Sequence, residues 1–234
     1  MKIKELIILA GGLGTRLRSA VPELPKCMAP VHGIPFIDYV VDHFLSQGVE
    51  RIIFALGYQS EILQEHLENK YSDLDIAFSV ENYPLGTGGA IQLAAKQAIH
   101  ENVLVTNGDT LFKADLSQLS QIHEDKKSTC TLVLKPMAQF DRFGVVEVDE
   151  HHAISSFKEK QYYNEGLING GIYALHIPSL VEKGLGESFS FEKDYLEQFV
   201  TDKKMYASIQ DAYFIDMGIP EDYKRAAEEL RCKG

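Results

Sequence analysis

A glycine-rich turn with cations behind it is the first stretch of the sequence whose residue types could do chemistry. Residues 9–18 read LAGGLGTRLR, so three glycines and a threonine follow an apolar run, and two arginines come after them. Lys26 follows a few residues later in a Pro-Lys pair. Backbone N–H groups of such a turn can cradle a phosphate, arginine adds a forked donor and lysine a point charge. The residue types therefore indicate a phosphate site.

Three interpretations of this turn compete on the residues alone. A P-loop requires GxxxxGK followed by Ser or Thr, and that lysine is absent. A dinucleotide fingerprint requires GxGxxG, but the third glycine position after Gly12 and Gly14 holds Leu17. The remaining alternative is a plain strand-to-helix turn without a ligand. The hydroxyl and cationic groups of Thr15, Arg16 and Lys26 favour the phosphate site over that plain turn.

Charge and cysteine content argue against several classes of protein. The net charge of −11 at pH 7 disfavours binding of nucleic acid, which needs a basic footprint. Residues 1–30 nevertheless carry five lysine and arginine side chains against two glutamates. Cys27, Cys130 and Cys232 lie far apart without CxxC spacing, which argues against structural zinc and disulfides and favours a cytoplasmic location. No apolar run predicts a signal peptide or a membrane span.

The elements that must position the turn alternate between strands and helices in the first half of the chain. The strand-like apolar runs are 3–10, 51–56, 74–80 and 103–106, and the segments of helical spacing are 35–48, 59–67 and 90–99. Such alternation predicts parallel strands joined by right-handed crossovers. In sheets of this kind the ligand cleft lies at the carboxyl ends of the strands.

The second half of the chain has a different pattern. The expected helices are 116–123, 191–200 and 220–230, and the short β runs are 129–134, 145–148, 154–157 and 167–175. Short strands separated by turns predict antiparallel additions to the sheet. The fold class is therefore α/β, with a Rossmann-like mixed sheet that is mostly parallel. We expect one domain over residues 1–234.

Eight blocks together resemble the sugar-1-phosphate nucleotidyltransferases, also called nucleotide-sugar pyrophosphorylases. The blocks are LAGGLGTRLR at 9–18, LPKCMAPVHGIPFIDY at 24–39, VENYPLGTGGA at 80–90, VTNGDT at 105–110, FGVVEV at 143–148, FKEK at 157–160, INGGIY at 168–173 and FIDMGIPEDY at 214–223. The sequence departs from the family pattern at Cys27, where proline is common, and at Ile34, where lysine is common. The resemblance implies the nucleotide-diphospho-sugar transferase fold. Its nucleotide-binding half would span about 1–110 and its sugar-phosphate half about 111–234.

The resemblance implies attack of a sugar 1-phosphate on the α-phosphorus of a nucleoside triphosphate, with pyrophosphate as the leaving group. Because two polyanions must meet, such a site needs charge neutralisation and positioning rather than a covalent nucleophile. By resemblance, Asp109 and Asp216 hold Mg²⁺ or Mn²⁺. This agrees with the preference of Mg²⁺ for one or two carboxylates together with phosphate oxygens.

The resemblance also assigns residues to each substrate. The nucleotide-binding residues are Leu9, Ala10, Gly11, Gly12, Gly14, Thr15, Arg16, Glu81, Gly86, Thr87 and Gly88. The residues for the sugar phosphate are Lys26, Gly144, Glu159, Lys160, Asn169 and Gly170. The catalytic residues would be Arg16, facing the leaving pyrophosphate, Lys26, near the α-phosphate or sugar phosphate, and Asp109.

Glu81 bears on the identity of the base. A carboxylate only accepts hydrogen bonds, so it suits an edge with two neighbouring donors, as guanine has at N1–H and its 2-amino group. It could also accept the single N–H of uracil, so the residue favours GTP without excluding other nucleotides. Glutamine is frequent at this position in the thymidylyl- and uridylyltransferases of the family.

The PLGTGGA block and Glu81 are most similar to short members that act on D-glycero-α-D-manno-heptose 1-phosphate for bacterial surface polysaccharide. Mannose-1-phosphate guanylyltransferases and short uridylyl- or thymidylyltransferases are the alternatives. An inactive regulatory module that binds a nucleotide sugar is the alternative from another class, and Arg16, Lys26, Asp109 and Asp216 argue against it. The expected partners are GTP or another nucleotide and a sugar 1-phosphate, with no nucleic acid or membrane. Family members often associate, so a homo-oligomer remains open.

Overall fold

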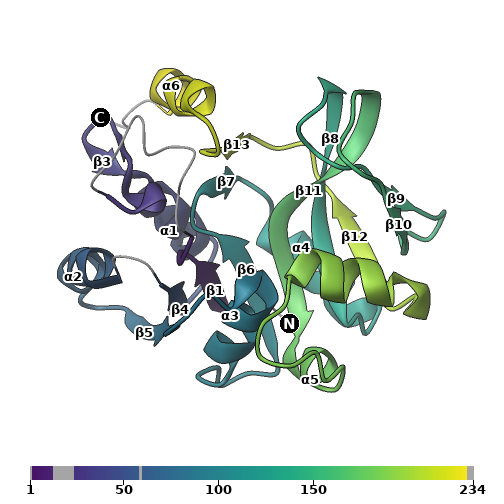
Figure 1. Ribbon diagram of the computed structural model, residues 1–234, viewed down its shortest axis with the longest axis horizontal. Helices are drawn as coiled ribbons and strands as arrows, with labels where there is room; N and C mark the ends of the chain where they lie inside the picture. Colours follow the sequence, from purple (N-terminus) through teal and green to yellow (C-terminus); the bar gives the residue numbers. More distant parts are fainter. Residues whose placement is uncertain (1, 13–23, 58–59, 231–234) are drawn as a thin grey trace.

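One seven-stranded sheet organises the chain in the computed structural model, which describes residues 2–12, 24–57 and 60–230 (Figure 1). The order of the strands across the sheet is β12-β8-β11-β6-β1-β4-β5. Their bounds are β1 Glu5–Leu9, β4 Arg51–Leu56, β5 Asp75–Val80, β6 Asn102–Asn107, β8 Cys130–Phe140, β11 Tyr163–His176 and β12 Met205–Ile209.

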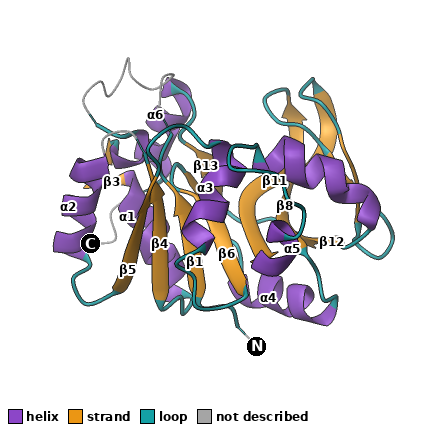
Figure 2. Cartoon of the chain, turned by 60° about the horizontal axis from the view of Figure 1, so that its bottom comes forward, coloured by secondary structure: helices purple, strands orange, loops and turns teal. Residues whose placement is uncertain are grey.

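The pairing directions confirm the predicted mixed sheet. Strand β1 lies between β4 and β6 and is parallel to both, and β4 is also parallel to β5. Strand β11 is antiparallel to its neighbours β6 and β8, and β12 returns parallel to β8 at the sheet edge. Figure 2 shows β5, β4, β1 and β6 side by side in that order. The first half therefore supplies the parallel part and the second half the antiparallel extension.

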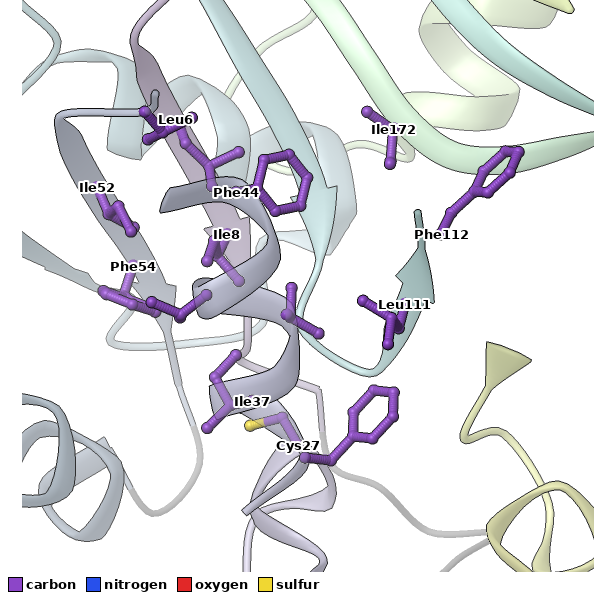
Figure 3. Packing of buried hydrophobic residues seen from close by; sticks show 14 of the residues in the cluster. Leu6, Ile8, Cys27, Ile37, Phe44, Ile52, Phe54, Leu111, Phe112 and Ile172 are labelled. Carbon is purple, nitrogen blue, oxygen red and sulfur yellow. The ribbon is translucent and has the colours of Figure 1, made fainter. Parts of the chain in front are cut away.

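Helices cover both faces of this sheet. The helical elements of the described chain are α1 Phe36–Ser46, α2 Ser60–Lys70, α3 Gly86–Ala95, α4 Leu116–Asp125, α5 Ile177–Val181, α6 Pro220–Glu229, the 3₁₀ turns η1 Lys26–Met28 and η3 Val200–Asp202, and the π-helix η2 Phe191–Glu197. Because side chains alternate along a strand, Leu6 and Ile8 pack in one core cluster with α1 and α2 (Figure 3). Ile7 packs on the opposite face with α3 and η2. Within the described residues, none of the helices is long and apolar enough to cross a membrane.

Several short elements were not predicted. Strands β2 Pro30–Val31 and β3 Ile34–Pro35 form a small hairpin that the sequence did not predict. By contrast, β9 Val146–Val148 and β10 Ile154–Phe157 fall in predicted β runs and pair with each other. Strands β7 Thr110–Phe112, β12 and β13 Phe214–Asp216 were missed, because two of them have three residues and all take their partners from remote segments. The pair β7–β13 places Asp216 opposite Thr110, next to Asp109.

Helix α3 begins at Gly86, four residues before the predicted start at Ala90. The segment GTGG has a low intrinsic helix propensity because it contains three glycines. Its helical form depends on tertiary packing, since a Cβ atom at Gly89 would lie 2.2 Å from the carbonyl oxygen of Glu187. Only glycine lets this first turn approach the backbone of residues 187–189 so closely.

His123 connects α4 to two strands that flank β11. Its Nε2 lies 3.0 Å from Asn102 Oδ1 in β6, and its Nδ1 lies 3.0 Å from Thr131 Oγ1 in β8. Because the amide oxygen only accepts, the proton of the neutral ring is on Nε2. Burial, helped by the charge of His176, lowers the pKa of His123 from 6.5 to about 4. The ring is therefore neutral in the folded protein at neutral pH.

The free energy of unfolding should fall as the pH decreases from 6.5 to about 4, because the unfolded chain takes up a proton at His123 that the folded chain refuses. The contribution is fully present above pH 6.5 and amounts to about 3 kcal/mol over the whole window. Urea unfolding of the wild type and His123→Gln at pH 7 and pH 4.5 measures it. The variant should lose much of this dependence, whereas His100→Gln, which changes an exposed histidine, should keep it. Equal slopes for all three proteins would contradict the prediction.

Candidate functional site

A cavity of about 700 Å³ opens at the carboxyl ends of β1, β4 and β6, where the sequence predicts a ligand cleft. Of the predicted nucleotide and catalytic residues, its walls include Leu9, Ala10, Gly11, Gly12, Lys26, Glu81, Gly86, Thr87 and Asp109. The predicted residues Gly14, Thr15 and Arg16 lie outside the described part of the chain. The structure therefore gathers four separate sequence blocks around one cavity.

A second cavity of about 450 Å³ lies beside the first, on the antiparallel side of the sheet. Its walls include Gly144, Glu159, Lys160, Asn169, Gly170 and Asp216 from the prediction. Asn107, at the end of β6, and Glu192, on η2, line both cavities. The two cavities thus form one continuous site with a shared boundary.

Lys26 joins the two cavities through a pair of carboxylates. Its ammonium forms an ion pair with Asp109 and lies 3.9 Å from Asp216 Oδ1. Lys26 sits on the 3₁₀ turn η1 directly after Pro25, and only 18% of its side chain is exposed. Burial and the neighbouring charge of Asp109 raise the pKa of Asp216, although Lys26 and Arg142 oppose this. One ammonium therefore leaves the negative charge of the pair incompletely balanced.

This pair of carboxylates fits a divalent cation that also binds phosphate. Among the residues that the structure describes, no group of three or more His, Cys, Asp and Glu side chains could hold a metal alone. Mg²⁺ does not need such a cage, because it commonly takes one or two carboxylates and fills its other positions with phosphate oxygens and water. Asp109 and Asp216 meet that requirement, because both approach the same ammonium.

Cys27, next to Lys26, departs from the family pattern and is a packing residue. It is 3% exposed and belongs to the core beneath the site, together with Ile37 (Figure 3). Burial is the main cause that raises the pKa of its thiol to about 12, with a further contribution from the charge of Asp109. Because a thiol of that pKa stays protonated at neutral pH, Cys27 is not an activated nucleophile.

The predicted glycines have different neighbours. Gly86 lines the larger cavity and has a φ of +72°, which disfavours any other residue. Gly88 is buried, and a Cβ atom there would lie 2.1 Å from the ring of Phe189. Gly170 is similarly close to Phe112, and Gly144 to the carbonyl of Lys158. The prediction that Gly88 contacts the nucleotide therefore receives no support from its position, which is explained by packing.

Glu81 lies at the end of β5 on the wall of the larger cavity. Its Oε2 accepts a hydrogen bond from the backbone N–H of Leu85 at 3.1 Å. Its Oε1 faces the turn after β4, where a Cβ atom at Gly57 would come within 2.8 Å. The carboxylate is thus held at the cavity by its own loop, and Gly57 leaves the room for it.

Asn169 is more constrained than the sequence suggests. Its Oδ1 accepts from the N–H of Gly171 at 3.0 Å, and its Nδ2 donates to the hydroxyl of Tyr173 at 2.9 Å. Asn107 and Glu192, which line both cavities, were not predicted as site residues. The block VTNGDT contains Asn107 and could have indicated it as a site residue. The segment around Glu192 has a pattern that indicates a helix but no binding site.

A glycine turn and a lysine between two carboxylates, set at the carboxyl ends of parallel strands, define an α/β enzyme that acts on phosphorylated substrates. Comparison with known proteins gives the family. The chain belongs to the nucleotidyl transferase family, whose model matches residues 5–233.

Three relatives illustrate the similarity. The D-glycero-α-D-manno-heptose 1-phosphate guanylyltransferase of Aneurinibacillus thermoaerophilus is 47% identical, over 97% of this chain and 98% of that protein. The enzyme of the same name from Campylobacter jejuni is 43% identical, over 94% and 96% of the two chains. The crystal structure of HddC from Yersinia pseudotuberculosis complexed with GMP-PN has a TM-score of 0.86 and 34% identity, with 98% and 100% of the two chains covered.

Lys26→Ala should damage turnover far more than the fold. The substitution removes the cation between two carboxylates, so we expect kcat to fall by about 100-fold or more, the range that removal of one transition-state donor produces. The variant should still unfold in one cooperative thermal transition, because Lys26 belongs to the cavity wall and not to the hydrophobic core. Lys4→Ala, which removes an exposed ion pair with Glu50, is the matched control and should leave kcat unchanged. Loss of the cooperative transition in Lys26→Ala would indicate a structural role instead.

Proposed function

We propose that this protein transfers a guanylyl group from GTP to D-glycero-α-D-manno-heptose 1-phosphate and releases pyrophosphate, for the synthesis of bacterial surface polysaccharide. The observation that carries the proposal is the position of Lys26 between Asp109, which lines the larger cavity, and Asp216, which lines the smaller one. The heptose 1-phosphate guanylyltransferases that match at 47% and 43% identity over nearly full length support the choice of both substrates. The complex of HddC with GMP-PN supports a guanine nucleotide.

In this proposal GTP occupies the larger cavity and the sugar 1-phosphate the smaller one. A phosphate oxygen of the sugar forms a bond to the α-phosphorus of GTP, and the bond from that phosphorus to the bridging oxygen of the β-phosphate breaks. Lys26 faces both phosphates in this arrangement, so its ammonium offsets the negative charge that develops between them. Lys160 binds the sugar phosphate, and Glu159 takes a sugar hydroxyl. A divalent cation on Asp109 and Asp216 would supply further charge neutralisation to the triphosphate.

The two halves of the single sheet correspond to the two substrates in this proposal. Residues up to about 110 carry the nucleotide, and residues from about 111 carry the sugar phosphate, within one catalytic domain. The predicted glycine-turn residues Gly14, Thr15 and Arg16 would wrap the triphosphate. The cysteine content predicts a cytoplasmic location. Whether the chain forms a homo-oligomer can be tested by size-exclusion chromatography.

The decisive experiment is a matrix of the four common nucleoside triphosphates against heptose, mannose and glucose 1-phosphates, with pyrophosphate release as the measurement. We expect the highest kcat/KM for GTP with the heptose phosphate. A clear preference for mannose 1-phosphate or for UTP or TTP would replace the substrates but keep the reaction. No release with any pair would favour an inactive nucleotide-sugar-binding module.

Asp216→Asn should abolish most turnover, by about 100-fold or more, because an amide is a weak ligand for Mg²⁺ and carries no charge. Asp109→Asn should behave alike. Manganese titration in the presence of GTP, followed by electron paramagnetic resonance, should show weaker binding in both variants. Asp211→Asn changes an exposed carboxylate paired with Lys135 and serves as the control. Near-normal rates at saturating Mg²⁺ would refute the assignment.

Glu81→Gln should reduce the preference for GTP over UTP by about tenfold, the value of one hydrogen bond to a charged acceptor. The glutamine oxygen can still accept from the N–H of Leu85, so the loop should keep its conformation. The ratio of kcat/KM for the two nucleotides measures the effect, and the KM for the sugar phosphate is the internal control. An unchanged ratio would show that other groups read the base.

A further inference from the structure

Glu192 is the acidic side chain at the boundary of the two cavities, and the described residues hold only one of its two carboxylate oxygens. It lies on the π-helix η2 and lines both cavities. Its Oε2 accepts hydrogen bonds from the hydroxyls of Thr87 at 2.7 Å and Ser190 at 3.2 Å. Within the described part of the chain, Oε1 has no hydrogen bond or ion pair. One oxygen is thus fixed to the protein while the other is available at the boundary.

Thr87 uses its hydroxyl proton for Glu192. The same oxygen accepts from the backbone N–H of Phe191 at 2.9 Å. A hydroxyl has a single proton to donate, so in this arrangement Thr87 has none left for a nucleotide in the larger cavity. Its geometry suits a residue that orients Glu192 rather than one that binds GTP directly.

The segment before η2 cannot shift easily relative to α3. The carbonyl of Phe189 accepts from the N–H groups of Gly88 at 3.0 Å and Gly89 at 3.3 Å, and the N–H of Phe189 donates to the carbonyl of Leu85 at 2.9 Å. The glycines permit this contact, because a Cβ atom on either would overlap residues 187–189. The PLGTGG block therefore fixes the position of the segment that leads into η2, the helix that carries Glu192.

Glu192 also has neighbours in the smaller cavity. Glu192 and Tyr173 both line the smaller cavity, and the charge of Glu192 contributes, after burial, to raising the pKa of the Tyr173 hydroxyl. Tyr173 in turn accepts from Asn169. A carboxylate only accepts hydrogen bonds and repels phosphate, whereas sugar hydroxyls donate. Between two polyanionic substrates, an oriented carboxylate suits the neutral hydroxyls of the sugar ring.

We propose that Glu192 Oε1 accepts a hydrogen bond from a hydroxyl of the sugar 1-phosphate, and that Thr87 is the positioning residue that holds Glu192 for this task. The inference rests on the proposed function, which places the sugar in the smaller cavity. The inference changes the role of Thr87: the sequence assigned this residue to the nucleotide, whereas here it serves binding of the sugar.

Steady-state kinetics with GTP and the heptose 1-phosphate test the proposal. Glu192→Gln should raise the KM for the sugar phosphate by about 10- to 100-fold, since a hydrogen bond to a charged acceptor is lost or weakened, and should leave the KM for GTP within about twofold. Thr87→Val should raise the same KM by a smaller factor, and Thr87→Ser, which keeps the hydroxyl, should restore it. Glu182→Gln, which removes the same charge from an exposed position, is the matched control.

Two results would overturn the inference. One is an unchanged KM for the sugar phosphate in Glu192→Gln, and the other is a Thr87→Val variant that raises the KM for GTP alone. Calorimetric binding of the heptose 1-phosphate gives a readout that does not depend on turnover, and Glu192→Gln should weaken it by the same factor. If the wild type binds this sugar phosphate but turns over no pair of substrates, the proposed function fails while the role of Glu192 is still measured. Calorimetric binding of GTP to each variant verifies that the nucleotide side remains intact.

Discussion

The sharing of one ammonium by two carboxylates from distant segments is the constraint on which the site depends. Lys26 comes from a short turn after the glycine-rich loop, Asp109 follows β6 and Asp216 ends β13. The β7–β13 pair and the hydrogen bond from the N–H of Met217 to the carbonyl of Asp109 hold these segments together. Two carboxylates that share one ammonium repel each other, so the fold favours additional positive charge at this place. In our proposal, the phosphates of the two substrates meet there.

The mixed sheet explains why two cavities lie side by side. Parallel strands β4, β1 and β6 end at one edge, where the larger cavity opens, and the antiparallel strand β11 carries the wall of the smaller one. The pairing of β11 with β8 is interrupted between Asn169 and Tyr173, and Gly171 within that interruption has a φ of +74°. A Cβ atom there would lie 2.9 Å from Asn107 Nδ2. The irregular stretch therefore makes room for Asn107 at the boundary of the cavities.

The segment that the sequence assigns to nucleotide binding also has a structural role, because it packs against the element that carries Glu192. Gly88 and Gly89 lie against residues 187–189, and Thr87 bonds to Glu192. As a result, the wall of the larger cavity and the wall of the smaller cavity are fixed to each other. In our proposal this contact lets the nucleotide half position an acceptor for the sugar.

The sequence by itself determined the α/β class, the mixed sheet and the nucleotidyl transferase family, because strand periodicity and eight ordered blocks are local properties of the chain. It also named Lys26, Asp109 and Asp216, whose convergence the structure then showed. Only the tertiary structure decided the start of α3, the strand β12 and the positions of Asn107 and Glu192. These depend on contacts between segments up to about a hundred residues apart, such as Thr87 with Glu192, and no local pattern encodes which remote backbone a glycine will touch.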